Sequence, residues 1–271
     1  GGTCGVDYHP TAGRGGPTGR VTGRTLVVGL QPRAGRLPFH AVTFEDYYRD
    51  NVTYISRVDP RLAKIIELTT QRKPSSTLDI GCGRGFLLGH LAQRGLSGLA
   101  GLDVYDDVSD PRFDYIRADV TQPFPIADAS YELVIAGEII EHVPNPDDFL
   151  REIRRVVTPG GTVIISTPNL VSWANRVLVP FGVQPLGTET SSEIALGRRH
   201  RILGQGNQVQ GHLKVFTHRA LAEIMQRYGF EITHRLGVPA FFPKPVDRFD
   251  RLMAKRVAFA SLIIFLGANG T

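Results

Sequence analysis

The sequence predicts a doubly wound α/β domain with a mostly parallel sheet, and three observations carry this prediction. Short apolar runs alternate with helical patterns between residues 60 and 170, as in repeated strand–helix units. A glycine-rich loop at 81–85 joins the apolar run 77–80 to the helical segment 86–91. The run 131–136 is almost continuously apolar, as in a strand covered on both faces. Because such sheets bind ligands at the carboxyl ends of their strands, we expect a nucleotide-type site at the glycine loop.

The segments up to residue 170 follow in a regular order. Pro60 opens a helix in the manner of proline at a first helical position, and Leu62, Ile65, Ile66 and Leu68 mark its buried face. After the glycine loop and its helix, we expect strands at 99–103, 113–120 and 131–136, a helix capped by Asn145 with Pro146 at its first position, and a strand at 162–167.

The alternation breaks at residues 171–211, which are mostly polar and loop-like. A long polar insertion after a core strand is typical of a cap over a site or of a disordered segment. Beyond it, we expect a helix from Thr217 to Gly229, a strand at 230–233 and a final buried strand at 260–266, which is too short to span a bilayer.

Charge distribution bears on the class of partner. The net charge is +5, and residues 1–38 hold five arginines against one aspartate, which accounts for +4 of it. The rest of the chain is therefore close to neutral, and bulk charge does not indicate a nucleic-acid platform there. We expect a small-molecule partner.

Composition also sets the domain organisation. Residues 1–38 are rich in Gly, Arg, Thr and Pro, so we predict a disordered tail followed by one domain over 39–271. The tail lacks the apolar core of a secretory signal. The two cysteines, Cys4 and Cys82, are far apart, which excludes a disulfide framework and fits a cytoplasmic location.

The chemistry of the glycine loop indicates the kind of ligand. Its spacing is G-x-G-x-G, and Asp79 stands just before the first glycine. The dinucleotide fingerprint is G-x-G-x-x-G, whose helix N-terminus receives a pyrophosphate. A carboxylate at Asp79 repels a phosphate but accepts a hydrogen bond from an ammonium group. The loop therefore favours a nucleoside with an amino-acid tail over NAD.

The segment 78–85, Leu-Asp-Ile-Gly-Cys-Gly-Arg-Gly, resembles motif I of class I S-adenosylmethionine-dependent methyltransferases. The resemblance extends over residues 74–170, where the helix after Pro146, the turn Pro159-Gly160-Gly161 and the next strand recur in the same order. It also extends in part to ubiquinone-pathway O-methyltransferases. It implies an enzyme, S-adenosylmethionine as cofactor, and a Rossmann-like seven-stranded sheet with an antiparallel C-terminal edge strand.

The predicted cofactor-binding residues lie at the strand ends. Asp103 follows the loop by about 20 residues, where a carboxylate accepts the ribose hydroxyls, although a strand-end Asp also serves as a helix cap or turn residue. The resemblance implies that Asp119 accepts from the adenine amino group and that Val120 packs on the ring. The full set is Asp79, Gly81, Cys82, Gly83, Gly85, Asp103, Val104, Asp119, Val120 and Glu138.

The candidate catalytic residues are His142 and Glu141. Methyl transfer requires alignment of the reacting atoms, and it requires a base when the acceptor is a hydroxyl. We expect His142, with a pKa near neutral, to be that base and Glu141 to hold its tautomer.

A metal site is the alternative interpretation of the same residues. Glu138, Glu141 and His142, with the later His212, are similar to the metal site of small-RNA 2′-O-methyltransferases. Such a set suits a divalent metal that lowers the pKa of a hydroxyl. In many methyltransferases of this kind the same Glu-His-Val segment occurs without a metal, and the histidine caps a helix or packs under the cofactor.

Three functions remain open at this point. The first is O-methylation of a small-molecule, glycan or lipid-linked acceptor, in a pocket built from residues 39–55 and a cap at 171–216. The second is metal-assisted O-methylation of an RNA 3′ end or a quinone precursor. The third is a non-catalytic nucleoside-binding module, which the retention of Asp79, Asp103 and Asp119 disfavours.

Overall fold

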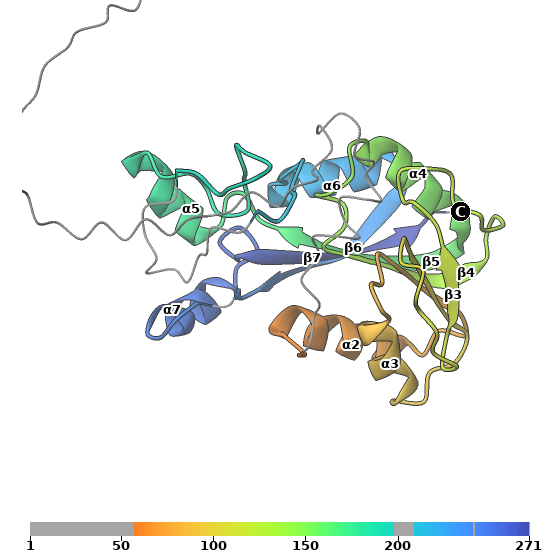
Figure 1. Ribbon diagram of the computed structural model, residues 1–271. Helices are drawn as coiled ribbons and strands as arrows, with labels where there is room; N and C mark the ends of the chain where they lie inside the picture. The colour runs from red at the N-terminus through yellow and green to blue at the C-terminus, as the bar shows by residue number, and fades with distance from the viewer. Residues whose placement is uncertain (1–56, 198–208, 241, 271) are drawn as a thin grey trace, which may run out of the picture. The chain divides into compact units, whose positions relative to one another are not determined.

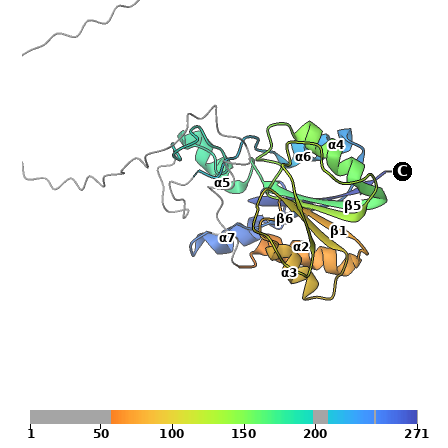
Figure 2. The same cartoon turned by 45° about the vertical axis from the view of Figure 1, so that its right-hand side comes forward.

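A computed structural model describes residues 57–197, 209–240 and 242–270. The predicted tail at 1–38 and the 39–55 part of the predicted acceptor pocket lie outside the described residues. The described residues form one seven-stranded sheet with helices on both faces (Figures 1 and 2). The predicted α/β architecture is confirmed.

The sheet has the strand order β3-β2-β1-β4-β5-β7-β6. Its strands are β1 (Thr77–Ile80), β2 (Leu99–Asp103), β3 (Asp114–Arg117), β4 (Tyr131–Gly137), β5 (Val157–Pro168), β6 (Phe230–Val238) and β7 (Leu262–Asn269). The pairings among β1 to β5 are parallel, and β7 runs antiparallel to both β5 and β6. The predicted antiparallel C-terminal strand is therefore present, and it lies one position inside the edge strand β6.

The helices are α2 (Pro60–Arg72), α3 (Phe86–Ala92), α4 (Pro146–Val156), α5 (Trp173–Leu178), α6 (His218–Arg227) and α7 (Val246–Met253), with a 3-10 turn at Val179–Phe181. Figure 1 shows α4 and α6 on one face of the sheet and α2 and α3 on the other. The side chains of each strand alternate between the two faces. Accordingly Leu78 and Ile80 pack in the cluster that holds Phe149 of α4, and Leu133 and Ile135 pack in the cluster that holds Ile65 of α2.

The predicted helix starts are confirmed at atomic detail. Asp59 caps α2 by accepting from the Leu62 N–H at 2.7 Å, with Pro60 at the first position. Asn145 caps α4, again followed by proline, and Thr217 caps α6. These caps occupy backbone donors that have no partner inside a helix.

Two helices were not predicted, namely α5 and α7. Each is short, and their residues do not form a long apolar stripe. The helices are held instead by Asp250 of α7, which is fully buried and accepts from Trp173 Nε1 at 2.6 Å, Ala240 N at 2.7 Å and Ser261 Oγ at 2.5 Å. Trp173 thus holds α5 to α7.

Candidate cofactor and acceptor site

The glycine loop lies between β1 and α3 and is held by the neighbouring strand. Gly81, Gly83 and Gly85 have φ values of +73°, +57° and +79°, a region that glycine occupies without strain. A Cβ built on Gly83 has no atom within 4 Å, so this side of the loop is open. The Asp103 carboxylate at the end of β2 accepts from Gly83 N and Val104 N, each at 2.7 Å.

Asp79, in β1, shares its surroundings with Asp103. Its side chain is buried, and burial raises its pKa to about 8, with a further increase from the Asp103 carboxylate and a decrease from Arg61. Burial also raises the pKa of Asp103, and the hydrogen bonds from the backbone N–H groups of Val104 and Gly83 lower it in part. The two carboxylates therefore form one acidic site, as the parallel pairing of β1 with β2 predicts.

The third predicted acid, Asp119, lies beyond β3 rather than at its end, because β3 stops at Arg117. Its Oδ1 accepts from Thr121 N and Thr121 Oγ1, each at 2.8 Å, which fixes the turn. Val120 is buried and packs in the same apolar cluster as Phe124.

Arg61 is a site residue that the sequence reasoning missed. Its side chain is buried on α2, with Nη2 3.9 Å from Asp59 Oδ2, and its positive charge lowers the pKa of Asp79 and of Glu138. A Cβ on Gly137 would lie 3.0 Å from Arg61 Nη1, so the glycine that ends β4 admits the guanidinium. The available signal was a basic residue four positions before Ile65, on the apolar stripe of the helix.

Glu138 follows β4 in a left-handed conformation, with φ +57°. Such a conformation is uncommon for a residue with a Cβ and is frequent at functional sites. Its Oε1 accepts from Ser166 Oγ at 3.4 Å. Burial raises its pKa, and the charges of Arg61 and His212 oppose that increase.

Glu141, His142 and His212 form a cluster in which one potential ligand atom from each lies within 4.8 Å of the others. His142 Nδ1 lies 3.2 Å from the Gly211 carbonyl oxygen, and His212 Nδ1 lies 2.7 Å from that of Gly187. A carbonyl only accepts, so each Nδ1 carries a proton, and in the neutral form of either ring the lone pair is on Nε2. The two backbone carbonyls thus set both tautomers.

The Glu141 side chain is fully buried. Its Oε2 accepts from Thr167 Oγ1 at 3.0 Å, and its Oε1 has no hydrogen-bond partner among the described residues. Burial raises the pKa of Glu141 well above its usual range, and Glu138 adds to the increase. A buried oxygen without a partner in a native fold calls for an explanation, of which a bound water, an ion and a catalytic role are examples.

Three details differ from expectation. His142 Nε2 is 4.0 Å from Glu141 Oε1, which is too far for a hydrogen bond, so Gly211 rather than Glu141 holds the tautomer. Burial and the nearby His212 lower the pKa of His142 to about 4 rather than leaving it near neutral. Of the four predicted metal ligands the structure groups three, while Glu138 lies outside that group.

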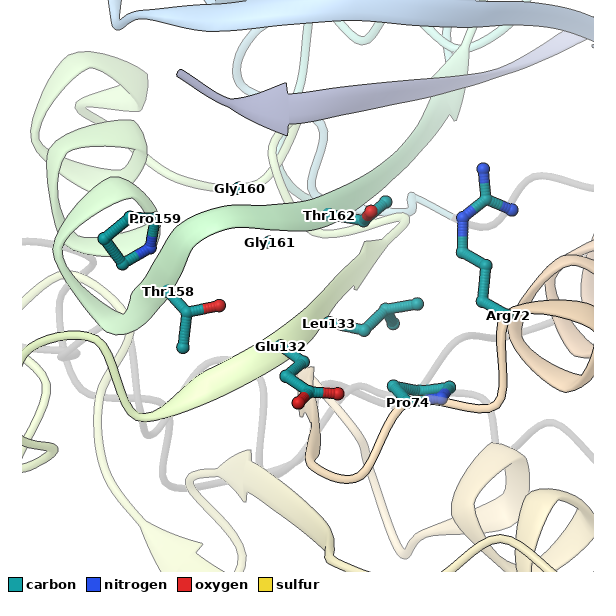
Figure 3. A pocket seen from close by; sticks show the side chains of 9 residues that line it. All are labelled: Arg72, Pro74, Glu132, Leu133, Thr158, Pro159, Gly160, Gly161 and Thr162. Atoms are coloured by element: carbon teal, nitrogen blue, oxygen red, sulfur yellow. The ribbon is translucent and has the colours of Figure 1, made fainter. Parts of the chain in front are cut away.

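A separate cavity of about 420 Å³ lies at the opposite end of the strands (Figure 3). Its walls include Arg72 at the end of α2, Glu132 and Leu133 of β4, and the 158–162 part of β5. Leu133 pairs with Thr77, the first residue of β1, so this cavity is at the amino ends. The cofactor residues are at the carboxyl ends, and the cavity is not part of their site.

An open parallel sheet with a glycine loop and carboxylates at its strand ends defines an α/β nucleoside-binding protein. A sequence model named methyltransferase domain matches residues 53–235. The chain therefore belongs to this family and is an S-adenosylmethionine-dependent methyltransferase. The family membership confirms the enzyme and the cofactor, against the non-catalytic module considered above.

Individual relatives agree with this assignment. A probable S-adenosylmethionine-dependent methyltransferase of Mycolicibacterium smegmatis is 32% identical over 189 residues, 65% of this chain and 68% of that protein. A ubiquinone biosynthesis O-methyltransferase of Saccharophagus degradans is 31% identical over 211 residues, 74% of this chain and 81% of that protein.

Solved structures show the same fold. A putative methyltransferase of Bacillus halodurans aligns with a TM-score of 0.54 at 14% identity, over 78% of this chain and 99% of that one. An S-adenosylmethionine-dependent methyltransferase of Methanosarcina mazei aligns with a TM-score of 0.52 at 17% identity, over 76% and 97%. None of the helices in the described part of our chain combines the length and apolarity that a bilayer crossing requires.

Protonation of Asp79 predicts a proton release on cofactor binding. With a pKa of about 8, Asp79 is mostly protonated at pH 7 in the free protein, and an ammonium group favours its charged form. Calorimetry at pH 7 in buffers of different ionisation enthalpy is expected to show release of close to one proton, and affinity is expected to rise from pH 6 to pH 8. Asp79→Asn is expected to abolish the release; equal release in the variant contradicts the prediction.

Arg61 is expected to set the pH range of cofactor binding. Because its charge lowers the pKa of Asp79, Arg61→Met moves the midpoint of the affinity–pH curve upward by about one unit or more and weakens binding at pH 7. The half-buried Lys64 on the same helix, which pairs with Glu67, gives the control Lys64→Met, which leaves the curve in place. An Arg61→Met curve that overlays the wild-type one refutes the role.

Proposed function

We propose that the protein transfers the methyl group of S-adenosylmethionine to an oxygen atom of a small-molecule, glycan or lipid-linked acceptor. The observation that carries this proposal is the half-buried pair His142 and His212 beside the buried Glu141, of which Glu141 and His142 lie just beyond the end of β4. A hydroxyl must lose its proton as it is methylated, and such a pair supplies a base. The Saccharophagus degradans relative is named as an O-methyltransferase, which supports oxygen as the target.

In this proposal each of the three aspartates binds a different part of the cofactor. Asp79 accepts from the ammonium group, Asp103 accepts from the ribose hydroxyls, and Asp119 accepts from the adenine amino group while Val120 packs on the ring. The loop residues Gly81, Cys82, Gly83 and Gly85 and the neighbouring Val104 line the nucleoside. Arg61, beside Asp79 and Glu138, receives the carboxylate of the methionine part.

His142 is the proposed base. Burial lowers its pKa to about 4, so its ring is neutral at physiological pH and its Nε2 carries a lone pair. That lone pair takes the hydroxyl proton as the oxygen attacks the methyl carbon and the sulfonium sulfur leaves as a neutral thioether. The positive charge then formed on His142 faces the Glu141 carboxyl, whose Oε1 is 4.0 Å from Nε2.

The segment 171–216 is the proposed cap of the acceptor site. Gly187 and Gly211, both within it, contact the two histidines directly. Exclusion of water by such a segment protects the sulfonium from hydrolysis and strengthens the electrostatic interactions inside the site. A cytoplasmic location, expected from the two distant cysteines, remains a prediction.

Metal-assisted O-methylation of a quinone precursor or an RNA 3′ end is the second candidate. The favouring observation is the unpartnered Oε1 of fully buried Glu141 beside two imidazoles, a donor set that suits a divalent transition metal. A metal held by Glu141, His142 and His212 would lower the pKa of an acceptor hydroxyl. The carbonyls of Gly187 and Gly211 orient the two rings by the same hydrogen bonds in either case.

Loss of His142 is expected to remove methyl transfer but not cofactor binding. The protein is incubated with methyl-labelled S-adenosylmethionine and phenols, hydroxylated lipids, glycans or RNA 3′ ends, and label is sought in an ether product. His142→Gln lowers kcat by about 100-fold or more, with the cofactor Kd within about twofold. The control His234→Gln alters an exposed residue of β6 and retains full activity. Full activity of His142→Gln refutes the proposed base.

The metal candidate predicts that dialysis against a chelator removes activity and that Mn²⁺, Co²⁺ or Zn²⁺ restores it. Calorimetry is expected to show metal binding to the wild-type protein that is at least about tenfold weaker in His212→Gln. Full activity in the chelator, with no metal binding, eliminates the metal candidate and leaves His142 as a metal-independent base.

A further inference from the structure

Glu189 joins two parts of the cap that are distant in the sequence. Its Oε1 accepts from Gln210 N at 2.6 Å, and its Oε2 accepts from Gly211 N at 2.8 Å and His212 N at 3.2 Å. Three consecutive backbone donors thus converge on one carboxylate, in the manner of an anion-binding nest. Hydrogen bonds to an ionised acceptor are about twice as strong as neutral ones.

The backbone that Glu189 holds is the backbone that orients the histidine pair. Gly187, two residues before Glu189, presents its carbonyl to His212 Nδ1 at 2.7 Å. Gly211 donates its N–H to Glu189 and presents its carbonyl to His142 Nδ1. The two carbonyls that contact the imidazoles therefore belong to Gly211, which Glu189 binds, and to Gly187, which is two residues from Glu189.

The far end of the segment is held independently. Leu213 N and Lys214 N donate to the Glu141 carbonyl oxygen at 2.8 and 3.0 Å. The backbone around His212 is consequently held by two sets of hydrogen bonds, one to the Glu189 carboxylate and one to the backbone carbonyl of Glu141. Loss of the first removes the hydrogen bonds that Glu189 accepts from Gly211 N and His212 N, and so weakens the restraint on the Gly211 carbonyl that contacts His142.

We propose that Glu189 is a positioning residue that fixes the Nδ1-protonated tautomers of His142 and His212 and so keeps Nε2 as the atom that carries the lone pair of each neutral ring. The contribution of Glu189 to catalysis rests on the proposed function of the histidine pair. Glu189 touches neither reacting atom and acts through the 210–212 backbone. An alanine side chain accepts no hydrogen bond from the N–H groups of residues 210–212, and a glutamine side chain offers one acceptor oxygen in place of two.

The test compares Glu189→Ala and Glu189→Gln with Glu193→Ala. Glu193 is exposed on the same segment, and its carboxylate makes no hydrogen bond or ion pair within the described residues. Two-dimensional NMR of ¹⁵N-labelled histidine side chains reports the tautomer of each ring, with His142→Gln and His212→Gln used to assign the signals. Cofactor Kd, thermal midpoint and kcat with an active acceptor are measured on the same proteins.

In the wild-type protein and in Glu193→Ala, both rings are expected as the Nδ1-protonated tautomer. In Glu189→Ala the two signals move toward tautomer averaging and kcat falls about 10- to 100-fold, the range found when a ligand-orienting partner is removed. The cofactor Kd stays within about twofold. Glu189→Gln gives intermediate tautomer shifts and intermediate activity.

Unchanged histidine signals in Glu189→Ala overturn the proposal, including the case in which only the thermal midpoint falls, since that describes a loop-stabilising role. Altered histidine signals in Glu189→Ala with an unchanged kcat support the proposal that Glu189 positions the rings. The same result refutes the use of the histidine pair in catalysis. The His142→Gln assay separates the two conclusions, because its activity tests the proposed function without involving Glu189.

Discussion

The site depends on carboxylates held out of water at the carboxyl ends of neighbouring strands. Asp79, Asp103, Glu138 and Glu141 all have pKa values raised first by burial. Removing an ionised carboxylate from water is costly unless a partner compensates. Arg61 supplies part of that compensation from α2, and a ligand with its own ammonium group supplies more. In the free protein Asp79 is therefore mostly protonated at pH 7, and a nearby cation favours its ionised form, so the site suits a ligand with an ammonium group better than a pyrophosphate.

The fold brings these groups together with few requirements on the side chains themselves. In a parallel sheet the carboxyl ends of β1, β2 and β4 meet at one edge, and register places Asp79 beside Gly101 and Ile135. Local sequence therefore predicts much of the site: the glycine loop, the spacing from the loop to Asp103, the helix starts at Pro60 and Thr217 and the helix cap at Asn145 are short-range patterns. Those predictions agree with the structure because each depends on contacts within one turn or between adjacent strands.

The parts that sequence reasoning did not predict depend on distant residues. Arg61 is not assigned to the site by any local pattern, because its role arises only where α2 passes Gly137. The pKa of His142 depends on burial beneath a segment some 70 residues away, and its tautomer depends on Gly211 rather than on adjacent Glu141. The helices α5 and α7 are stabilised by Asp250, whose partners span residues 173 to 261. Periodicity carries no information on such contacts.

The histidine pair is the point at which the common fold becomes a particular enzyme. The cofactor half of the site is built from strand ends, whereas His212 reaches the site on a segment outside the sheet's alternating strands and helices. Among the contacts that fix its approach are hydrogen bonds to backbone carbonyls and to one carboxylate. Hydrogen bonds are directional, so they define ring orientation more closely than apolar contacts do. In the proposed function, this segment contributes to the acceptor site while the strand ends bind the methyl donor, so the two tasks fall on different parts of the chain.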